Sequence, residues 1–224
     1  MSARHLLAFF ALMLTSATAV AASGWNQTVT LTPQGSHVLG NPKAAVKLTE
    51  YVSYTCPHCA HFEVQADGPL RMGYIASGKV SVEVRHLVRD PIDLTVAQFT
   101  NCGPKEKFFG NHTAFMRSQQ QWIQLLMNAT PAQRIRWQTG DTLTRQRAIA
   151  SDFHLYEIMA GRGYSRPQLD HCLADKALAQ RIAAQGADAE KLGIEATPSF
   201  TINGVLLAGT HSWDTLEPQL KLKL

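Results

Sequence analysis

The most constraining feature of this chain is a pair of cysteines two residues apart, Cys56 and Cys59, in the motif Cys-Pro-His-Cys. An apolar run at residues 46–52 precedes the motif and a helix-like pattern follows it, so Cys56 falls where a strand ends and a helix begins. Free backbone N–H groups at a helix N-terminus favour an anion, and the thiolate is the nucleophilic form of cysteine. Pro57 fits the first helical turn, and His58 can add positive charge or a hydrogen bond beside the Cys56 sulfur. The motif therefore predicts a reactive dithiol that closes reversibly into a disulfide.

Two alternatives compete with redox chemistry for these cysteines. A Cys-x-x-Cys pair can be half of a tetrahedral zinc site, and His61 lies nearby. A structural zinc usually takes four ligands, often from a second cysteine or histidine pair, and the sequence has no second Cys-x-x-Cys. The other alternative is a purely structural disulfide. Because the pair stands at a strand–helix junction, we predict redox chemistry and no metal.

Length and composition set wide limits. At 224 residues the chain fits one domain, or one domain that carries an insertion, and 45% hydrophobic residues can form a substantial core. The net charge of +4 is small and its charges are scattered along the sequence, which argues against nucleic-acid binding.

The N-terminus has the pattern of an export signal. A short polar start precedes an apolar run at residues 6–14, and Ala19-Val20-Ala21 is a small-residue cleavage pattern. The apolar run is short for a membrane span, although an uncleaved anchor is the alternative. We therefore predict a signal peptide at residues 1–22 and an exported, mature protein.

Export changes how the remaining cysteines are interpreted. Cys102 and Cys172 are the two cysteines outside the motif. Disulfides form and persist in an oxidising compartment, so we predict that these two pair. Two separate buried thiols are the alternative.

Apolar patterning divides the rest of the chain into three parts. Alternation predicts strands at residues 28–32, 37–39, 46–52, 80–88, 198–202 and 205–208. Helical periodicity predicts a helix from Cys56 to about Ala76 and a last one at 212–222, with Asn203-Gly204 as a hairpin turn before it. Between the two groups of strands lie further predicted helices, at residues 95–101, 105–127, 131–137, 144–160, 166–173 and 176–192, with Asp93, Thr130, Asp141 and Ser165 as N-caps.

The order is β-α-β, a helical block, then β-β-α. This order predicts an α/β, thioredoxin-like fold with an inserted all-helical domain. We place the first half of the core at residues 23–92, the helical insertion at 93–192 and the second half of the core at 193–224.

Glu50 is an acid inside a strand that is otherwise suited to burial. By alternation it shares a face with Leu48 and Val52. It is either a solvent-facing edge carboxylate or a partly buried acid that relays the proton of Cys59. Burial among apolar groups raises the pKa of a carboxyl, which suits proton exchange near neutrality.

Taken together, these residues resemble the DsbA-like thiol:disulfide oxidoreductases of bacterial periplasms. The resemblance depends on Glu50 six residues before Cys56, on the Cys-Pro-His-Cys motif, on Phe62-Glu63 after it and on Thr197-Pro198 before the hairpin. It also includes the long helical insertion, and so covers nearly the whole predicted mature chain.

The resemblance implies a role for each residue around the motif. Cys56 is then the exposed nucleophile that forms mixed disulfides, and Cys59 is the buried resolving cysteine. His58 stabilises the Cys56 thiolate, which makes the oxidised protein a strong disulfide donor. Glu50 is the buried acid near Cys59, and Glu63 either joins the same charge network or is a solvated residue.

The resemblance also implies that Thr197 and Pro198 form a cis-proline loop facing the cysteines. Exposed backbone at Thr197 lets a substrate segment add as a short strand, which accommodates many sequences. Two features depart from the simplest members of the family. The best-known oxidases carry valine where this chain has Thr197, and they lack cysteines equivalent to Cys102 and Cys172.

The implied function is a periplasmic enzyme that donates its Cys56–Cys59 disulfide to reduced, exported polypeptides. A membrane partner of the DsbB type would reoxidise it, and no cofactor is required. One alternative is an isomerase or reductase with fewer clients, and the other is a thioredoxin-fold chaperone whose cysteines do no chemistry. The isomerase-type N-terminal dimerisation domain is not apparent, so we expect a monomer.

Overall fold

The computed structural model describes residues 24–224. The predicted signal peptide at residues 1–22 lies outside the described residues. Among the helices that are described, none combines the length and the apolar character that a membrane span requires.

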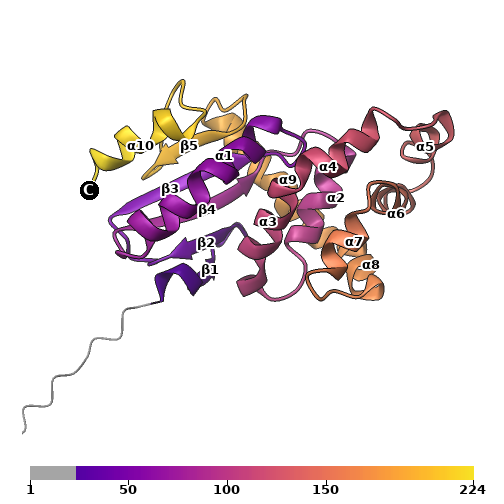
Figure 1. Cartoon of the computed structure of the whole chain (residues 1–224), viewed down its shortest axis with the longest axis horizontal. Helices are drawn as coiled ribbons and strands as arrows, with labels where there is room; N and C mark the ends of the chain where they lie inside the picture. Colours follow the sequence, from indigo (N-terminus) through magenta and orange to yellow (C-terminus); the bar gives the residue numbers. More distant parts are fainter. Residues whose placement is uncertain (1–23) are drawn as a thin grey trace, which may run out of the picture.

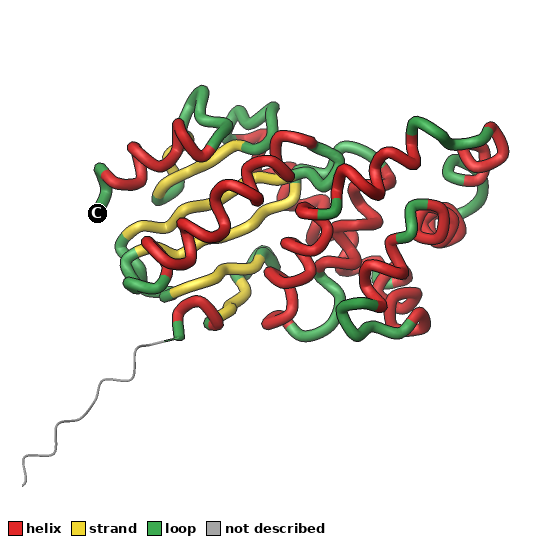
Figure 2. Tube along the Cα trace, in the orientation of Figure 1, coloured by secondary structure: helices red, strands yellow, loops and turns green. Residues whose placement is uncertain are grey.

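A six-stranded mixed sheet forms the centre of the fold (Figures 1 and 2). The strand order is β1-β2-β4-β3-β5-β6; β3 and β4 are parallel, and the other neighbours are antiparallel. The strands are β1 (Val29–Leu31), β2 (His37–Gly40), β3 (Val46–Val52), β4 (Val80–His86), β5 (Ser199–Ile202) and β6 (Val205–Leu206).

The central strand β3 is buried on both faces. Leu48 and Val52 belong to the main core together with Phe62 of the following helix, α1 (Pro57–Pro69). Tyr51 points to the opposite face, where it packs with Ala189 of α9 (Lys176–Lys191). Helices therefore cover both faces of the sheet, and Glu50 lies on the α1 face by the alternation of the strand.

The helical insertion lies at one end of the sheet, to the right in Figure 1. Its helices are α2 (Pro91–Thr100), α3 (Phe108–Arg117), α4 (Gln119–Ile123), α5 (Pro131–Arg136), α6 (Thr142–Asp152), α7 (Leu155–Ala160) and α8 (Arg166–Ala174). Helix α9 then returns to the sheet beside β4, and α10 (Trp213–Lys221) completes the core near the C-terminus. Short helical turns are η1 (Trp25–Gln27), η2 (Leu70–Ile75), η3 (Lys105–Lys107) and η4 (Gln124–Leu126).

The structure confirms the predicted fold class, a thioredoxin-like fold with an inserted helical domain. The domain boundaries given above stay predictions. The hairpin turn also has the backbone that its dipeptide favours, because Asn203 and Gly204 both have positive φ, 51° and 81°.

Several predicted helices are shorter in the structure. The predicted helix at 105–127 is interrupted at Ser118, and the one at 144–160 is interrupted at Phe153-His154, where His154 has a φ of 55°. After Pro69 the type of helix changes, since α1 continues directly into the π-helical turn η2.

Asp93 is not the N-cap of its helix, so that prediction is wrong. Asp90 caps α2, because its side chain accepts hydrogen bonds from the backbone N–H groups of Ile92 and Asp93. Pro91 occupies the first helical position, which shifts the start of α2 four residues upstream of the predicted one.

Cys102 and Cys172 form a disulfide across 70 residues of chain, with Cα atoms 5.7 Å apart. The bond joins the segment after α2 to helix α8.

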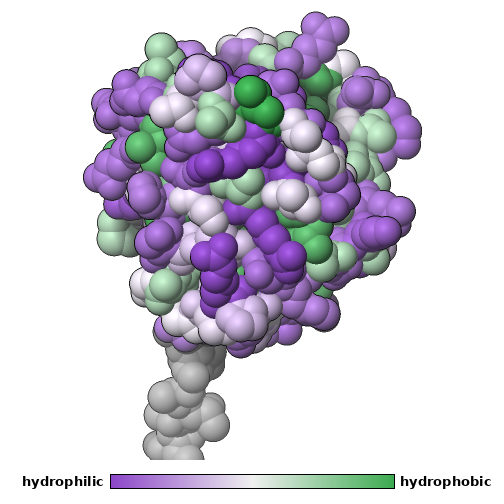
Figure 3. Space-filling model, turned by 90° about the vertical axis from the view of Figure 1, so that its right-hand side faces the viewer, coloured by the Kyte–Doolittle hydropathy of each residue, from purple (hydrophilic) through white to green (hydrophobic). Residues whose placement is uncertain are grey.

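The outer end of the helical insertion, which faces the viewer in Figure 3, is mostly hydrophilic, and the apolar side chains visible there are separated by polar ones.

Candidate active site

Cys56 lies at the junction of β3 and α1. Three residues, Ser53 to Thr55, connect the end of β3 to Cys56, which is the N-cap of α1 and has an extended backbone. Pro57 takes the first position of the helix, where its missing N–H costs no hydrogen bond. Cys59 follows one turn later and points into the core, where it is fully buried.

Two aspartates at the start of α2 hold the loop before Cys56. The buried carboxylate of Asp93 accepts hydrogen bonds from Ser53 Oγ at 2.6 Å and from the backbone N–H of Tyr54 at 2.7 Å. Asp90 accepts one from Thr55 Oγ1 at 2.7 Å. Burial raises the pKa of Asp93 to about 6, although its hydrogen bonds with Ser53 and Tyr54 act in the opposite direction.

Gln119 of α4 holds the same loop from the helical insertion. Its buried side-chain amide donates to the carbonyl oxygens of Tyr54 and Cys56, at 2.7 and 2.8 Å. The backbone on both sides of Thr55 is thereby fixed to the insertion.

The Cys56 sulfur faces the loop before β5. Its thiol donates a hydrogen bond to the backbone carbonyl of Thr197 at 3.1 Å, and the Thr197-Pro198 peptide bond is cis. Only 2% of Cys56 is exposed, so the expectation of an exposed nucleophile is wrong for this state. The Thr197 carbonyl is one of the groups that contact the buried sulfur.

The surroundings of Cys56 favour its thiolate. A hydrogen bond with the Cys59 thiol is the largest of the effects that lower the pKa of Cys56 to about 5. Burial opposes the shift, while hydrogen bonds from the backbone N–H groups of Cys59 and His58 add to it. Cys56 is therefore largely thiolate at neutral pH.

The surroundings of Cys59 favour the protonated thiol. Burial raises the pKa of Cys59 well above its ordinary value, and the neighbouring Cys56 sulfur and the charge of Glu50 raise it further. Glu50 is itself only 5% exposed, and burial followed by repulsion from Glu63 raises its pKa well above the usual range. The edge-carboxylate interpretation of Glu50 is thus inconsistent with its buried position.

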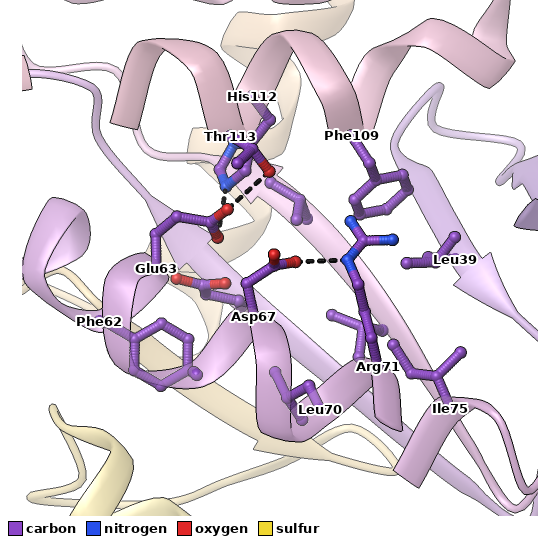
Figure 4. A pocket seen from close by; sticks show the side chains of 14 residues that line it. Leu39, Phe62, Glu63, Asp67, Leu70, Arg71, Ile75, Phe109, His112 and Thr113 are labelled. Atoms are coloured by element: carbon purple, nitrogen blue, oxygen red, sulfur yellow. Dashed lines mark hydrogen bonds and ion pairs between the residues drawn. The ribbon is translucent and has the colours of Figure 1, made fainter. Parts of the chain in front are cut away.

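Glu63 belongs to a polar cluster between α1 and α3 (Figure 4). Thr113 Oγ1 donates to one carboxylate oxygen at 2.7 Å, and His112 Nε2 lies 3.6 Å from the other. Burial raises the pKa of Glu63, but the hydrogen bond and charge of His112 and the hydrogen bond of Thr113 outweigh it, so the net shift is downward. Glu63 is buried, so the solvated alternative does not apply.

A cavity of about 30 Å³ lies beside this cluster. Glu50, Glu63, His112 and the ion pair of Asp67 with Arg71 line it, together with apolar side chains from β2, β4 and α1 (Figure 4). One or two water molecules need a volume of roughly this size and several polar partners. The cavity therefore offers Glu50 a place to exchange its proton.

The two residues between the cysteines are exposed. Pro57 and His58 face solvent, and the His58 imidazole makes no hydrogen bond or ion pair within residues 24–224. The contribution of His58 to the Cys56 sulfur comes from its backbone N–H. In the described part of the chain, no group of three or more histidine, cysteine, aspartate or glutamate side chains is arranged to hold a metal ion.

Sequence reasoning missed three residues that the structure brings to the site: Asp93 as a loop anchor, His112 and Gln119. The signal for the last two was present. Residues 108, 112, 115, 119 and 122 lie on one face of a helical pattern, and the face is apolar except at 112 and 119. A polar residue inside an apolar stripe is buried, and a buried polar group needs a partner.

The sheet, the helix-capping cysteine and the cis-proline loop define a thioredoxin-fold dithiol protein. A family model described as thioredoxin matches residues 32–221. In the crystal structure of protein-disulfide isomerase from Novosphingobium aromaticivorans, the chain is 54% identical over 84% of this chain and 96% of that one, with a TM-score of 0.81. The α-DsbA1 of Wolbachia pipientis shares the fold, with 24% identity, a TM-score of 0.67 and coverage of 86% of this chain and 92% of that one.

A curated relative from Rickettsia conorii, named as a protein-disulfide oxidoreductase, is 30% identical over 181 residues, which are 80% of this chain and 57% of that protein. The chain spans little more than half the length of the curated relatives that it matches. The chain belongs to the thioredoxin family.

Proposed function

We propose that this protein is a periplasmic thiol:disulfide oxidoreductase that passes its Cys56–Cys59 disulfide to reduced, exported polypeptides. One observation carries the proposal: the pKa of Cys56 is lowered to about 5, while that of Cys59 is raised. A thiolate at Cys56 stabilises the reduced dithiol, so the oxidised protein gives up its disulfide readily. This stabilisation is complete above the ordinary cysteine pKa and is lost as pH falls through about 5.

The reaction is two successive thiol–disulfide exchanges. A substrate thiolate attacks Cys56 Sγ, the Cys56–Cys59 bond breaks, and Cys59 leaves as a thiolate that takes up a proton. A second substrate thiolate then attacks the substrate sulfur of the mixed disulfide, and Cys56 leaves as a thiolate. The substrate gains a disulfide, the protein gains two electrons, and the site returns to the dithiol state that the structure describes.

Glu50 supplies the proton for Cys59. Its raised pKa favours the protonated carboxyl, and the adjoining cavity gives that proton a route to solvent. Substrate backbone pairs with Thr197, whose carbonyl lies 3.1 Å from the Cys56 sulfur. Binding through backbone groups suits an enzyme that acts on many sequences.

The predicted signal peptide supports a periplasmic location, where disulfides persist. The dithiol formed in each cycle must be reoxidised, and a membrane-bound, quinone-linked partner of the DsbB type fits that need. Both the polypeptide substrates and this oxidant belong to the proposal, as does a monomeric state.

An isomerase is the second candidate, and two observations favour it. The relative with 54% identity carries the name protein-disulfide isomerase, and this chain has threonine before the cis-proline. The chemistry at Cys56 is the same in both cases. The equilibrium between the dithiol and glutathione separates them, because a strongly reducing dithiol cannot act as a general oxidant.

The test is disulfide transfer from the oxidised protein to a reduced, unfolded protein with several cysteines. We expect Cys56→Ser to abolish transfer, Cys59→Ala to accumulate mixed disulfides, and alkylation of Cys56 by iodoacetamide to rise as pH passes through about 5. Full transfer by Cys56→Ser would refute the proposal. Scrambled ribonuclease, which needs isomerisation, tests the second candidate.

A further inference from the structure

We propose that a groove beside the dithiol binds an acidic side chain of the substrate, close in sequence to the cysteine that reacts with Cys56. The inference rests on the proposed function and narrows its substrate class. The groove lies between the β4–α2 loop and helix α6, has a volume of about 370 Å³, and is lined by Val88, Arg89, Asp90, Pro91, Leu94, Thr142, Arg145 and Gln146.

The topology places this groove next to the reactive cysteine. Strands β3 and β4 are parallel neighbours, so the loops that follow them meet at the same edge of the sheet. Cys56 is in the first loop and Arg89 in the second. The hydrogen bond from Thr55 Oγ1 to Asp90 joins the two loops directly, one residue from each of these positions.

The groove carries two arginines that have no acidic partner in the described part of the chain. Neither Arg89 nor Arg145 forms an ion pair with a carboxylate in residues 24–224, and the Arg145 guanidinium donates only to Thr142 Oγ1, at 3.2 Å. Arg147, on the same helix as Arg145, is by contrast paired with Asp170 of α8. A guanidinium without a carboxylate partner is a ready donor to an acidic side chain.

The acid in the groove is already engaged. Asp90 accepts hydrogen bonds from the backbone N–H groups of Ile92 and Asp93 and from Thr55 Oγ1, and it stands at the positive N-terminal end of α2. Its charge is therefore directed into α2 and the active-site loop. The groove presents net positive charge over an apolar floor of Val88, Pro91 and Leu94.

The same substrate segment can reach both the cis-proline loop and the groove. Strand β3 lies between β5 and β4, so a segment paired with Thr197 crosses Cys56 toward the β4–α2 loop. Neighbouring strands are about 4.8 Å apart and an extended chain advances about 3.3 Å per residue, so the groove is about two to four residues from the substrate cysteine. An aspartate or glutamate at that distance would meet Arg89 and Arg145.

The experiment measures the second-order rate constant of disulfide transfer from the oxidised protein to dithiol peptides, after acid quenching. One peptide series carries glutamate two to four residues before the reacting cysteine and another carries it after; glutamine and lysine replace it in matched peptides. We expect the wild type to favour glutamate over glutamine by about fivefold in at least one series, and less so in 0.5 M salt.

The variant Arg89→Gln/Arg145→Gln should lose that preference and react with the glutamine peptides at the wild-type rate. Arg147→Gln, which removes one positive charge from the helix that carries Arg145, is the control, and it should keep the preference. Equal rates for glutamate, glutamine and lysine peptides in both series would overturn the groove proposal, and so would an equal loss in Arg147→Gln. Failure to oxidise any peptide would instead refute the proposed function.

Discussion

The site works because two sulfurs one helical turn apart have opposite surroundings. Cys56 accepts hydrogen bonds at the start of α1, and these lower its pKa. Cys59 is buried in the core beside Glu50, and both the burial and the charge of Glu50 raise its pKa. Glu50 is the more unusual of these groups, because its carboxyl is only 5% exposed and forms no ion pair within residues 24–224. Burial of a charge that has no paired cation costs stability.

Glu50→Gln should therefore stabilise the protein and slow the reaction. The pKa of Glu50 is raised in the folded state, so the wild type loses stability as pH rises above the ordinary glutamate pKa toward the folded one. Glutamine removes this loss, and we expect about 1–2 kcal/mol more stability at pH 8 and little change at pH 4. We also expect slower release of Cys59 from the Cys56–Cys59 disulfide, and therefore slower formation of the mixed disulfide, because the nearby proton is gone.

Urea denaturation at both pH values and the rate of mixed-disulfide formation measure these effects. Glu190→Gln on the exposed side of α9 is the control for removal of a negative charge. If Glu50→Gln were less stable than the wild type at pH 8, the Glu50 carboxylate would be stabilised by a hydrogen-bond or charge partner in the folded protein. That result would contradict the proton-donor role.

For individual residues, the sequence alone predicts those site residues that lie close together in the chain and form one local motif. Cys56, Cys59 and Glu50 are within ten residues of one another, and the strand–helix junction determines their positions. The roles of His112 and Gln119 depend on packing between the insertion and the core, which no local pattern encodes. The contact between the Cys56 sulfur and Thr197 also depends on tertiary packing, because the two residues are 141 positions apart.

Among the elements, α2 and α4 of the insertion act as supports for the active-site loop. Asp93 at the start of α2 binds one side of the loop, and Gln119 at the start of α4 binds the other. The insertion therefore contributes to the position of Cys56 without supplying a reacting group. Gln119 is a positioning residue in this arrangement.

Gln119→Met should loosen the loop, because the carbonyls of Tyr54 and Cys56 lose buried donors while the volume is kept. We expect a loss of about 1–3 kcal/mol in the free energy of unfolding. The pH profile of Cys56 alkylation should also broaden or shift, which a purely structural role would not produce. Gln120→Met, the exposed neighbour on the same helix, is the control and should change neither quantity.

A wild-type alkylation profile in Gln119→Met would limit the residue to a structural role. Rescue by Gln119→Asn is not expected, since the shorter side chain cannot reach both carbonyls. Gln119→Glu is a sharper variant, because a carboxylate has no proton to donate and repels the Cys56 thiolate. It should raise the pKa of Cys56.

Strands were easier to predict from the sequence than helix ends. Alternation marks β3 at both of its ends, and Asn203-Gly204 marks the hairpin. The break at Ser118 has neither glycine nor proline, so the periodic pattern runs through it. The same holds for Phe153-His154, where the turn depends on tertiary packing of a fully buried Phe153.

Across the whole molecule, the Cys102–Cys172 disulfide and a group of buried histidines connect distant parts. The disulfide closes a loop of 70 residues, for which the chain-entropy estimate is a gain of about 4 kcal/mol. The sequence predicted this pair by elimination within an oxidising compartment. The histidines, His37, His86 and His112, surround Phe108 of α3 and join it to β2 and β4, which the sequence did not indicate.

These histidines make the molecule sensitive to acid. Burial lowers the pKa of His37 to about 4 and that of His86 to about 3, from an ordinary value of 6.5. Each folded-state pKa is depressed, so the unfolded chain takes up protons first as pH falls. Stability is fully present above pH 6.5 and is lost progressively as pH falls through 6.5 toward 4.

His37→Phe should remove its share of this acid sensitivity. The His37 ring stacks on Phe108, with ring centres 3.9 Å apart, and its buried Nδ1 has no hydrogen-bond partner within residues 24–224. Phenylalanine keeps the stack and cannot be protonated. At pH 4 the variant should be more stable than the wild type by about 2–3 kcal/mol, and at pH 7.5 the two should agree within about 1 kcal/mol. Urea denaturation at both pH values measures these stabilities, with His171→Gln at an exposed position as the control. If the stability of His37→Phe differed from that of the wild type by the same amount at both pH values, packing and not protonation of His37 would be the cause.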